Sequence, residues 1–226
     1  MATRITMAPG EFYHCYNRSV EKIEIFRSQK DYQRFLGLMY LCNGTRNIRI
    51  SDMMEWNFEK TLTDAVLDKG EPLVDICAYA LMPTHPHFII REIREKGTAR
   101  FMQKVFTGYT LYFNKKYGRM GSLFVGTFKS KHITDDIYLK QVVPYVLFNP
   151  VELFEPRWKT GEGNIKLIEK NLRGYPYSSL LDFLGENRIE NKIIGDTLRE
   201  FYPEQPSMIS MLEEAKTFYL ERSPEV

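Results

Sequence analysis

The pattern of apolar and polar residues predicts a β-hairpin near the middle of the chain. Residues 74–81 and 88–90 form two apolar runs bounded by charged residues, with a turn signal at Pro83 between them. Short apolar runs around such a signal are typical of two buried strands joined by a tight turn. His85 and His87 lie two residues apart beside the second run, so we expect both imidazoles on the same face of a sheet.

The rest of the chain up to residue 133 also divides into strands and helices. Residues 11–18 read as a first strand that ends in a polar pair. Apolar positions recur near the helical spacing over residues 28–41 and again over residues 97–118, which predicts two long helices. A further strand is expected over residues 122–133, with a bend at Gly126.

Two regions have weaker patterns. Residues 45–70 combine a β-like segment at 48–50 with a helical pattern at 59–67, and we interpret them as an insertion or a strand-plus-helix excursion. A polar, glycine-containing loop is expected after Phe154. Beyond it, the acidic tail predicts two short helical stretches, over residues 191–201 and 207–221.

The predicted helix over residues 137–149 carries an unusual polar face. It follows an N-cap signal at residues 134–136 and is otherwise apolar. Gln141, Tyr145 and Asn149 are spaced four residues apart, so they share one side of this helix. Because buried polar groups need partners, a stripe of amide, phenol and amide on an apolar helix indicates a function.

Composition and charge restrict the class of protein. The chain has 226 residues, 43% hydrophobic and 14% aromatic, which is typical of one well-cored domain or a domain with an appendage. Its three cysteines fit neither a disulfide framework nor a zinc-ligand spacing, and no apolar run is long enough to span a membrane. We therefore expect a reduced, cytoplasmic protein.

The net charge of +2 is unevenly distributed. Residues 91–140 contain eleven Lys and Arg against four Asp and Glu, whereas residues 151–226 contain ten against fourteen. A basic middle beside an acidic tail favours a polyanionic partner for the middle, although a solvated helix face gives the same count.

Paired imidazoles on a rigid sheet suit a divalent metal. An isolated His-x-His pattern is more often an ordinary hydrogen-bonded or solvated pair, and His14 reads as a histidine satisfied within the sheet. A histidine-triad hydrolase needs a third histidine two residues after His87. That position is Ile89 in this chain, which excludes the class. On these residues alone, the metal site and the ordinary hairpin both stay open.

Several short motifs together resemble the single-tyrosine HUH transposases, which include insertion-sequence transposases and REP-associated tyrosine transposases. They occur in the family's order and cover about residues 10 to 180. The matching stretches are Tyr13-His14 to Asn17-Arg18, residues 81–87, residues 112–114, residues 121–124 with Phe128-Lys129, residues 145–151, and Tyr177-Ser178-Ser179.

The resemblance implies a fold and a site. The family has an α+β, ferredoxin-like HUH fold with a central antiparallel sheet and the nucleophile on a helix beside it. Residues 1–180 would form this domain, and residues 181–226 an acidic, helical C-terminal extension. His85, His87 and Asn149 would bind Mg²⁺ or Mn²⁺. Tyr145 would be the nucleophile that forms a 5′-phosphotyrosine intermediate during cleavage and strand transfer.

The implied substrate is single-stranded DNA with a hairpin, handled by a monomer or a homodimer. Basic and polar residues on the first strand, the second long helix and the strand near residue 130 would hold the DNA. These predicted DNA-binding residues are Asn17, Arg18, Arg100, Lys104, Lys115, Lys116, Arg119, Lys129 and Lys131.

Two alternatives remain. One is a domesticated DNA-hairpin binding protein with weak or no cleavage, since Pro86, Thr127 and Pro144 depart from the family's pattern. The other is a replication-initiator-like HUH nickase, which shares the chemistry but is usually a longer protein.

Overall fold

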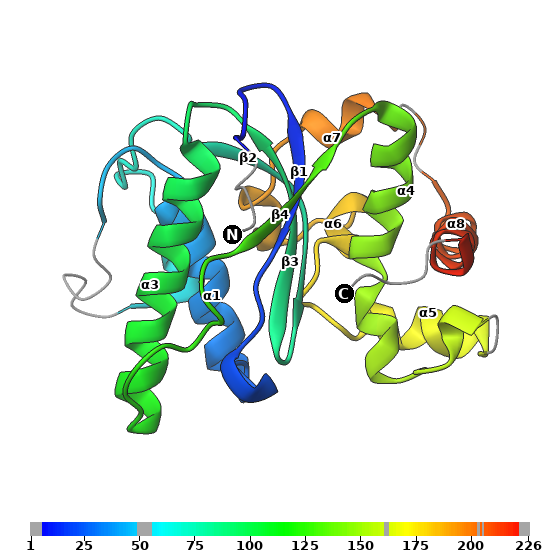
Figure 1. Cartoon of the computed structure of the whole chain (residues 1–226), viewed down its shortest axis with the longest axis horizontal. Helices are drawn as coiled ribbons and strands as arrows, with labels where there is room; N and C mark the ends of the chain where they lie inside the picture. The colour runs from blue at the N-terminus through cyan, green and yellow to red at the C-terminus, as the bar shows by residue number, and fades with distance from the viewer. Residues whose placement is uncertain (1–5, 49–55, 161–162, 203, 205, 222–226) are drawn as a thin grey trace.

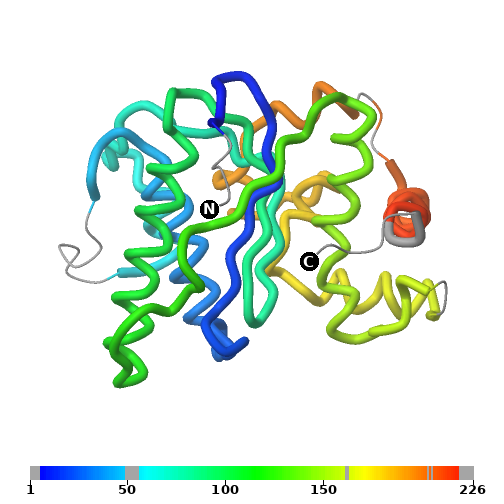
Figure 2. Tube along the Cα trace, viewed as in Figure 1, coloured from blue at the N-terminus to red at the C-terminus, as the bar shows by residue number. Residues whose placement is uncertain are grey.

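A central four-stranded antiparallel sheet organises the protein in this computed structural model, which describes residues 6–48, 56–160, 163–202, 204 and 206–221. The strand order is β2-β3-β1-β4. The strands are β1 (Phe12–Tyr16), β2 (Val74–Met82), β3 (His85–Glu92) and β4 (Lys129–Ile133). Figure 2 shows β1 and β4 running side by side although they lie far apart in the sequence.

Helices cover both faces of the sheet (Figure 1). One layer contains α1 (Gln29–Cys42), α2 (Phe58–Thr63) and α3 (Gly97–Tyr117). On the other side lie α4 (Asp136–Leu147), α5 (Ile165–Arg173), α6 (Leu180–Phe183) and α8 (Met208–Glu221), while α7 (Thr197–Glu200) packs near β2. The 3₁₀ helices are η1 (Val20–Lys22), η3 (Asn149–Leu153), η4 (Trp158–Thr160) and η5 (Ile189–Lys192).

The alternation of side chains along β3 divides the interior into two cores. Phe88 and Ile90 pack in the core under α1 and α3, whereas Ile89 packs in the core under α4. Because His85 and His87 are in phase with Ile89, both face α4. The prediction that the two imidazoles share a face is therefore confirmed.

The predicted hairpin is also confirmed. Met82 pairs with His85, so residues 83–84 form a two-residue loop between β2 and β3. The two long helices are confirmed as well, and α3 ends where Gly118 adopts a left-handed conformation with φ +62°.

The predicted strand over residues 122–133 is wrong in its first half. Only β4, from Lys129 onward, forms a ladder with β1, which ends at Tyr16. Beyond it, Val125 N donates to the Arg18 carbonyl and Val20 N to the Leu123 carbonyl, but these bonds do not extend into a strand. Gly126 has φ +57°, a turn conformation, and residues 122–128 form an irregular segment held at Phe124 by an isolated bridge to Ser19.

Other predictions need smaller corrections. The loop expected after Phe154 contains α5, whose Ile168 and Leu172 are buried. The helical pattern at 59–67 gives only α2, and the β-like segment at 48–50 lies largely outside the described residues. In the tail, α8 is confirmed, whereas the stretch over 191–201 contains only short turns of helix.

The C-terminal segment packs onto the sheet domain. Leu198, Met211 and Leu212 belong to the same buried core as Ala78 and Ala80 of β2. The residues expected to form an extension thus share the interior with the sheet, while the proposed boundary at residue 180 stays a prediction. No described helix combines the length and apolar character that crossing a bilayer requires.

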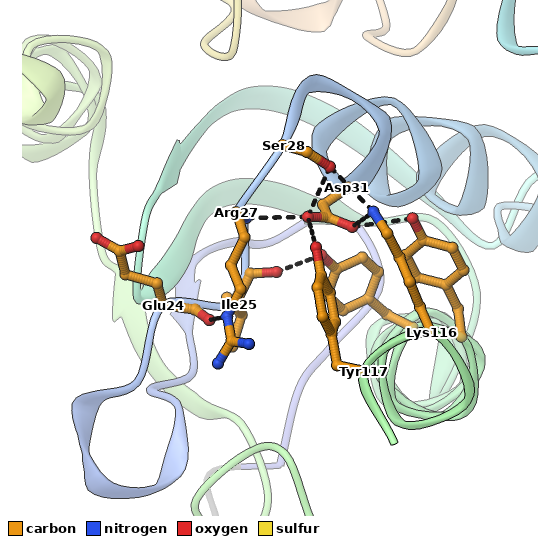
Figure 3. A network of polar contacts seen from close by, with 9 residues as sticks. Glu24, Ile25, Arg27, Ser28, Asp31, Lys116 and Tyr117 are labelled. Carbon is orange, nitrogen blue, oxygen red and sulfur yellow. Dashed lines mark hydrogen bonds and ion pairs between the residues drawn. The ribbon is translucent and has the colours of Figure 1, made fainter. Parts of the chain in front are cut away.

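A buried carboxylate joins the start of α1 to the end of α3 (Figure 3). Asp31 is fully buried and accepts hydrogen bonds from Ser28 Oγ, Lys116 Nζ and the hydroxyls of Tyr112 and Tyr117. Burial alone would raise the pKa of Asp31, but these hydrogen bonds outweigh it and hold the pKa below its usual value.

We expect Asp31→Ala to lower the free energy of unfolding by about 3 kcal/mol, because the substitution leaves the ammonium and both hydroxyls without their acceptor. Urea denaturation measures the change. Glu95→Ala is the control, because Glu95 is exposed and pairs with Lys96 at the surface, and we expect it to change stability by less than about 0.5 kcal/mol. Equal effects of the two substitutions would contradict a stabilising role for the buried network.

Candidate active site

Three histidines meet on the face of the sheet that α4 covers. His85 and His87 lie at the start of β3, with ring centroids 4.8 Å apart. His14, on the neighbouring strand β1, stacks on His87 at 5.2 Å with an interplanar angle of 11°. The antiparallel pairing of β1 with β3 therefore adds a third imidazole to the predicted pair.

Hydrogen bonds fix the orientation of both predicted ligands. His14 Nε2 lies 3.0 Å from His87 Nδ1, and Thr84 Oγ1 lies 2.8 Å from His85 Nδ1. With Nδ1 engaged on each ring, Nε2 is the nitrogen left for a metal. The interpretation of His14 as a satisfied sheet histidine is confirmed, but the sequence did not show that its partner is a predicted ligand.

Burial keeps the three imidazoles neutral. Burial lowers the pKa of His14 to about 4, with a smaller effect from Lys131. Burial, then Arg18, likewise lowers the pKa of His85 to about 4. For His87, which is 1% exposed, burial and the two other histidines hold the pKa well below its usual value. Neutral imidazoles are the form that binds metal ions.

Tyr145 reaches the histidines from α4. Its ring centroid lies 5.6 Å from that of His14 and 6.2 Å from that of His87. The pKa of Tyr145 is raised to about 12, mainly by burial and then by the nearby Glu152, against the lowering effect of a hydrogen bond to Asn149. The phenol is placed for attack on a group held at the histidines, but it needs assistance to act as a nucleophile at neutral pH.

Asn149 keeps its place beside Tyr145 although the helix ends earlier than predicted. α4 stops at Leu147, and Asn149 begins the 3₁₀ helix η3. Asn149 is buried and hydrogen-bonds the phenol. Pro144 lies within α4, and the helix continues past it.

Charged residues that the sequence analysis did not select surround the site. Glu152 affects the pKa of His85 and of Tyr145, and Lys159 affects that of His85. Lys159 Nζ lies 2.7 Å from Glu152 Oε1. Glu152 follows Asn149 by three residues in η3, a spacing that could have been noticed in the sequence.

The donor set fits a divalent ion without a carboxylate cluster. Within the described ranges, no three His, Cys, Asp or Glu side chains form a metal-binding group. The candidate ligands are the two Nε2 atoms and the Asn149 amide, and Mg²⁺ or Mn²⁺ would use further oxygens from water or phosphate. His85 and His87 thus lie together and Asn149 lies beside Tyr145, while their role as ligands and the metal itself stay predictions.

The last helix lies against Tyr145. α8 packs against α4, and the Phe218 ring meets the Tyr145 ring edge-on at 5.3 Å. The acidic tail therefore contributes a ring to the surroundings of the phenol.

The predicted DNA-binding residues divide between the two faces of the sheet. Lys129 and Lys131 are exposed on β4, in phase with Ile133, and therefore lie on the histidine face. Arg18 also influences the pKa of His85 and Tyr145. The cations of α3 lie on the opposite side of the sheet, where α1 packs against α3.

Several α3 cations have partners within the chain. Lys104 Nζ donates to the carbonyls of Gly44 and Arg46, and Arg100 donates to the carbonyl of Thr45. Lys116 binds Asp31, and Arg119 lies near the Asn114 amide, whereas Lys115 is exposed. The roles of all these residues in DNA binding stay predictions.

Comparison with known proteins gives structural similarity without a sequence match. No protein-family model matches the chain, and no curated protein sequence matches it. A solved structure described as "Structure of the REP associates tyrosine transposase bound to a REP hairpin" matches with a TM-score of 0.51 and 13% sequence identity. The match covers 84% of this chain and 90% of that chain. At this identity the likeness shows the fold alone, so the expected α+β architecture, a central antiparallel sheet with helices packed on it, is confirmed.

The buried histidines predict a loss of stability in acid. The pKa of His14 is about 4 in the folded chain and about 6.5 when unfolded, so the unfolded chain binds more protons between these values. Stability is therefore fully present above about pH 6.5 and falls as the pH decreases. We expect His14 alone to cost about 2 kcal/mol between about pH 7 and pH 5, measured by urea denaturation in chelator.

His14→Gln is the matched variant, because an amide can still hydrogen-bond His87 but does not titrate. The decrease in stability between the two pH values should be about 2 kcal/mol smaller in this variant. An identical decrease in both proteins would show that His14 already titrates normally in the folded chain.

Proposed function

We propose that this protein cleaves single-stranded DNA beside a hairpin and rejoins it elsewhere, through a covalent bond between Tyr145 and the DNA. The observation that carries the proposal is the position of the Tyr145 ring, edge-on to two members, His14 and His87, of a group of three neutral imidazoles on one face of the sheet. The shared fold supports it, since the neighbouring structure is a tyrosine transposase bound to a REP hairpin.

Tyr145 would attack the scissile phosphorus with its phenolic oxygen. The new bond joins this oxygen to phosphorus while the bond to the 3′ oxygen breaks. The phenol releases its proton to solvent, and the departing 3′ oxygen takes one up. One phosphodiester replaces another, so a 3′-hydroxyl can attack the phosphotyrosine and reverse the step with a new strand end.

The surrounding residues would orient and activate these groups. His85, His87 and Asn149 would hold Mg²⁺ or Mn²⁺, which would neutralise charge on the scissile phosphate. His14 acts on His87 as a positioning residue, because its hydrogen bond to Nδ1 directs Nε2 outward. Arg18 favours the phenolate, since its charge lowers the pKa of Tyr145 against the effect of burial.

Exposed cations on the same face would hold the DNA. Lys129 and Lys131 extend from the edge strand β4 next to the histidines, where they can contact phosphates of a strand that enters the site. A monomer or a homodimer is compatible with this arrangement.

A hairpin-binding protein without cleavage is the second candidate. It is favoured by the pKa of Tyr145, which burial raises to about 12, and by the Phe218 ring that lies against the phenol. Such a protein would bind the same DNA and form no covalent adduct.

We expect a covalent DNA–protein adduct that requires Mn²⁺ or Mg²⁺ and is lost in Tyr145→Phe, because the phenyl ring has no oxygen to attack phosphorus. The measurement is a denaturing gel of end-labelled, single-stranded hairpin oligonucleotides from a library. The labelled end retained on the protein identifies a 5′ linkage.

Tyr138→Phe on the same helix is the control and should retain the adduct. Binding without any adduct in the wild type would favour the hairpin-binding protein. Cleavage that persists in Tyr145→Phe would mean that water, not tyrosine, is the nucleophile.

The positioning role of His14 has its own test. We expect His14→Phe to weaken Mn²⁺ binding by roughly tenfold or more, because His87 loses the hydrogen bond that orients it. Isothermal titration with Mn²⁺ measures this without any DNA. His132→Phe is the matched control, since His132 pairs with Glu11 at the surface. Unchanged Mn²⁺ affinity in His14→Phe would exclude the positioning role.

A further inference from the structure

A cavity of about 500 Å³ lies on the face of the sheet opposite the histidines. It is bounded by one side of α3 and by the irregular segment 122–128, and Asn17, just after β1, lies at its wall. Every residue that lines it belongs to the described part of the chain and is uncharged. Its volume falls within the range of about 300–1,000 Å³ that small-ligand sites occupy.

Asn17 is the polar group that points to a ligand. It is 4% exposed, lines the cavity, and its side-chain amide makes no hydrogen bond to any described residue. Neither atom of this amide is among the fully buried polar atoms that lack a partner, so the amide is accessible where Asn17 lines the cavity. A ligand that offers both a donor and an acceptor would satisfy it.

The rest of the wall suits a flat, neutral molecule. The Phe106 and Phe124 rings pack 4.5 Å apart and form an apolar side, and the half-buried Phe128 ring adds a second aromatic surface. Thr107 and Thr127 contribute hydroxyl groups. Aromatic rings that stack and amides that pair are the groups with which proteins hold unpaired nucleobases.

A basic groove adjoins the cavity along α3. Gln103, Thr107 and Leu111 line both spaces, at successive four-residue steps of one helix face. The groove is larger, about 1010 Å³, and cations that include Lys104 and Lys115 line it. A neutral pocket beside a cationic groove matches a ligand whose flat, uncharged group is attached to phosphates, as in a DNA strand.

We propose that this cavity binds one unpaired base of single-stranded DNA and that Asn17 determines which base is accepted. The inference rests on the proposed function and assigns a base-reading site to it. The amide of asparagine pairs best with the edge of adenine, which offers one donor and one acceptor in matching positions.

The test compares DNA binding by full-length variants. The probes are fluorescent stem-loop oligonucleotides with a single-stranded flank of dA, dC, dG or dT, and copies with one abasic site at each flank position. In the wild type we expect a preference for dA and one position at which the abasic site weakens binding by about tenfold. In Asn17→Leu and Thr127→Trp that position should lose its effect, because the first removes the amide and the second fills the cavity.

Val125→Trp is the control, since Val125 is 57% exposed on the same segment and does not line the cavity. It should bind as the wild type does. Asn17→Leu should keep the melting temperature, because the Asn17 side chain makes no hydrogen bond to any described residue that the substitution would break. Thus weaker binding in this variant cannot be attributed to unfolding.

The outcomes separate this inference from the proposed function. No binding of any stem-loop by the wild type would overturn the proposed function itself. Tight binding with no sensitive flank position, or with a sensitive position that both cavity variants retain, would overturn the base-reading site alone. A preference for a base other than dA that Asn17→Leu abolishes would retain the pocket and correct the base.

Discussion

The antiparallel pairing of β1 with β3 is the contact on which the rest of the structure depends. It places His14 beside His87 on one face and Tyr13 and Cys15 against Phe88 and Ile90 on the other. A shift of β1 by one residue against β3 would move His14 to the face under α1 and α3, and Tyr13 and Cys15 to the face under α4. The separation of a packed core from a chemical site therefore follows from the two-residue period of these strands.

This arrangement buries polar side chains in the interior. Their hydrogen bonds offset only part of the free-energy cost of that burial. His14 and His87 satisfy each other, and both stay neutral because burial lowers their pKa values. Burial also raises the pKa of Tyr145, so the environment that keeps the imidazoles neutral makes the phenol a weaker acid. The proposed metal ion would bind to the neutral imidazoles. Its positive charge would lower the pKa of the nearby Tyr145 phenol and so offset the effect of burial.

Local patterns were sufficient to predict the hairpin, the long helices and the shared face of His85 and His87, because each depends on residues near one another in sequence. The role of His14 was not predictable, since the contact with His87 spans 73 residues and depends on strand pairing. The false strand at residues 122–128 also depends on distant pairing: its bonds to residues 18–20 amount to one bridge, at Ser19 and Phe124, and the turn at Gly126 separates that bridge from β4. Likewise, the ion pair of Lys116 with the buried Asp31 could not be predicted, because it depends on the packing of α1 against α3.

The two candidate sites lie back to back at one end of the sheet. Tyr16 pairs with His87 on one side and with Lys129 on the other, and the next residue, Asn17, turns to the opposite face and lines the neutral cavity. Successive residues of β1 thus lead to the histidine site and to the base-sized pocket. A single strand that passes around this end, near Arg18, would meet both within a few nucleotides. Strand β1 and the residue that follows it would then fix the distance between the site that recognises a base and the site that cleaves a phosphate, without a conformational change.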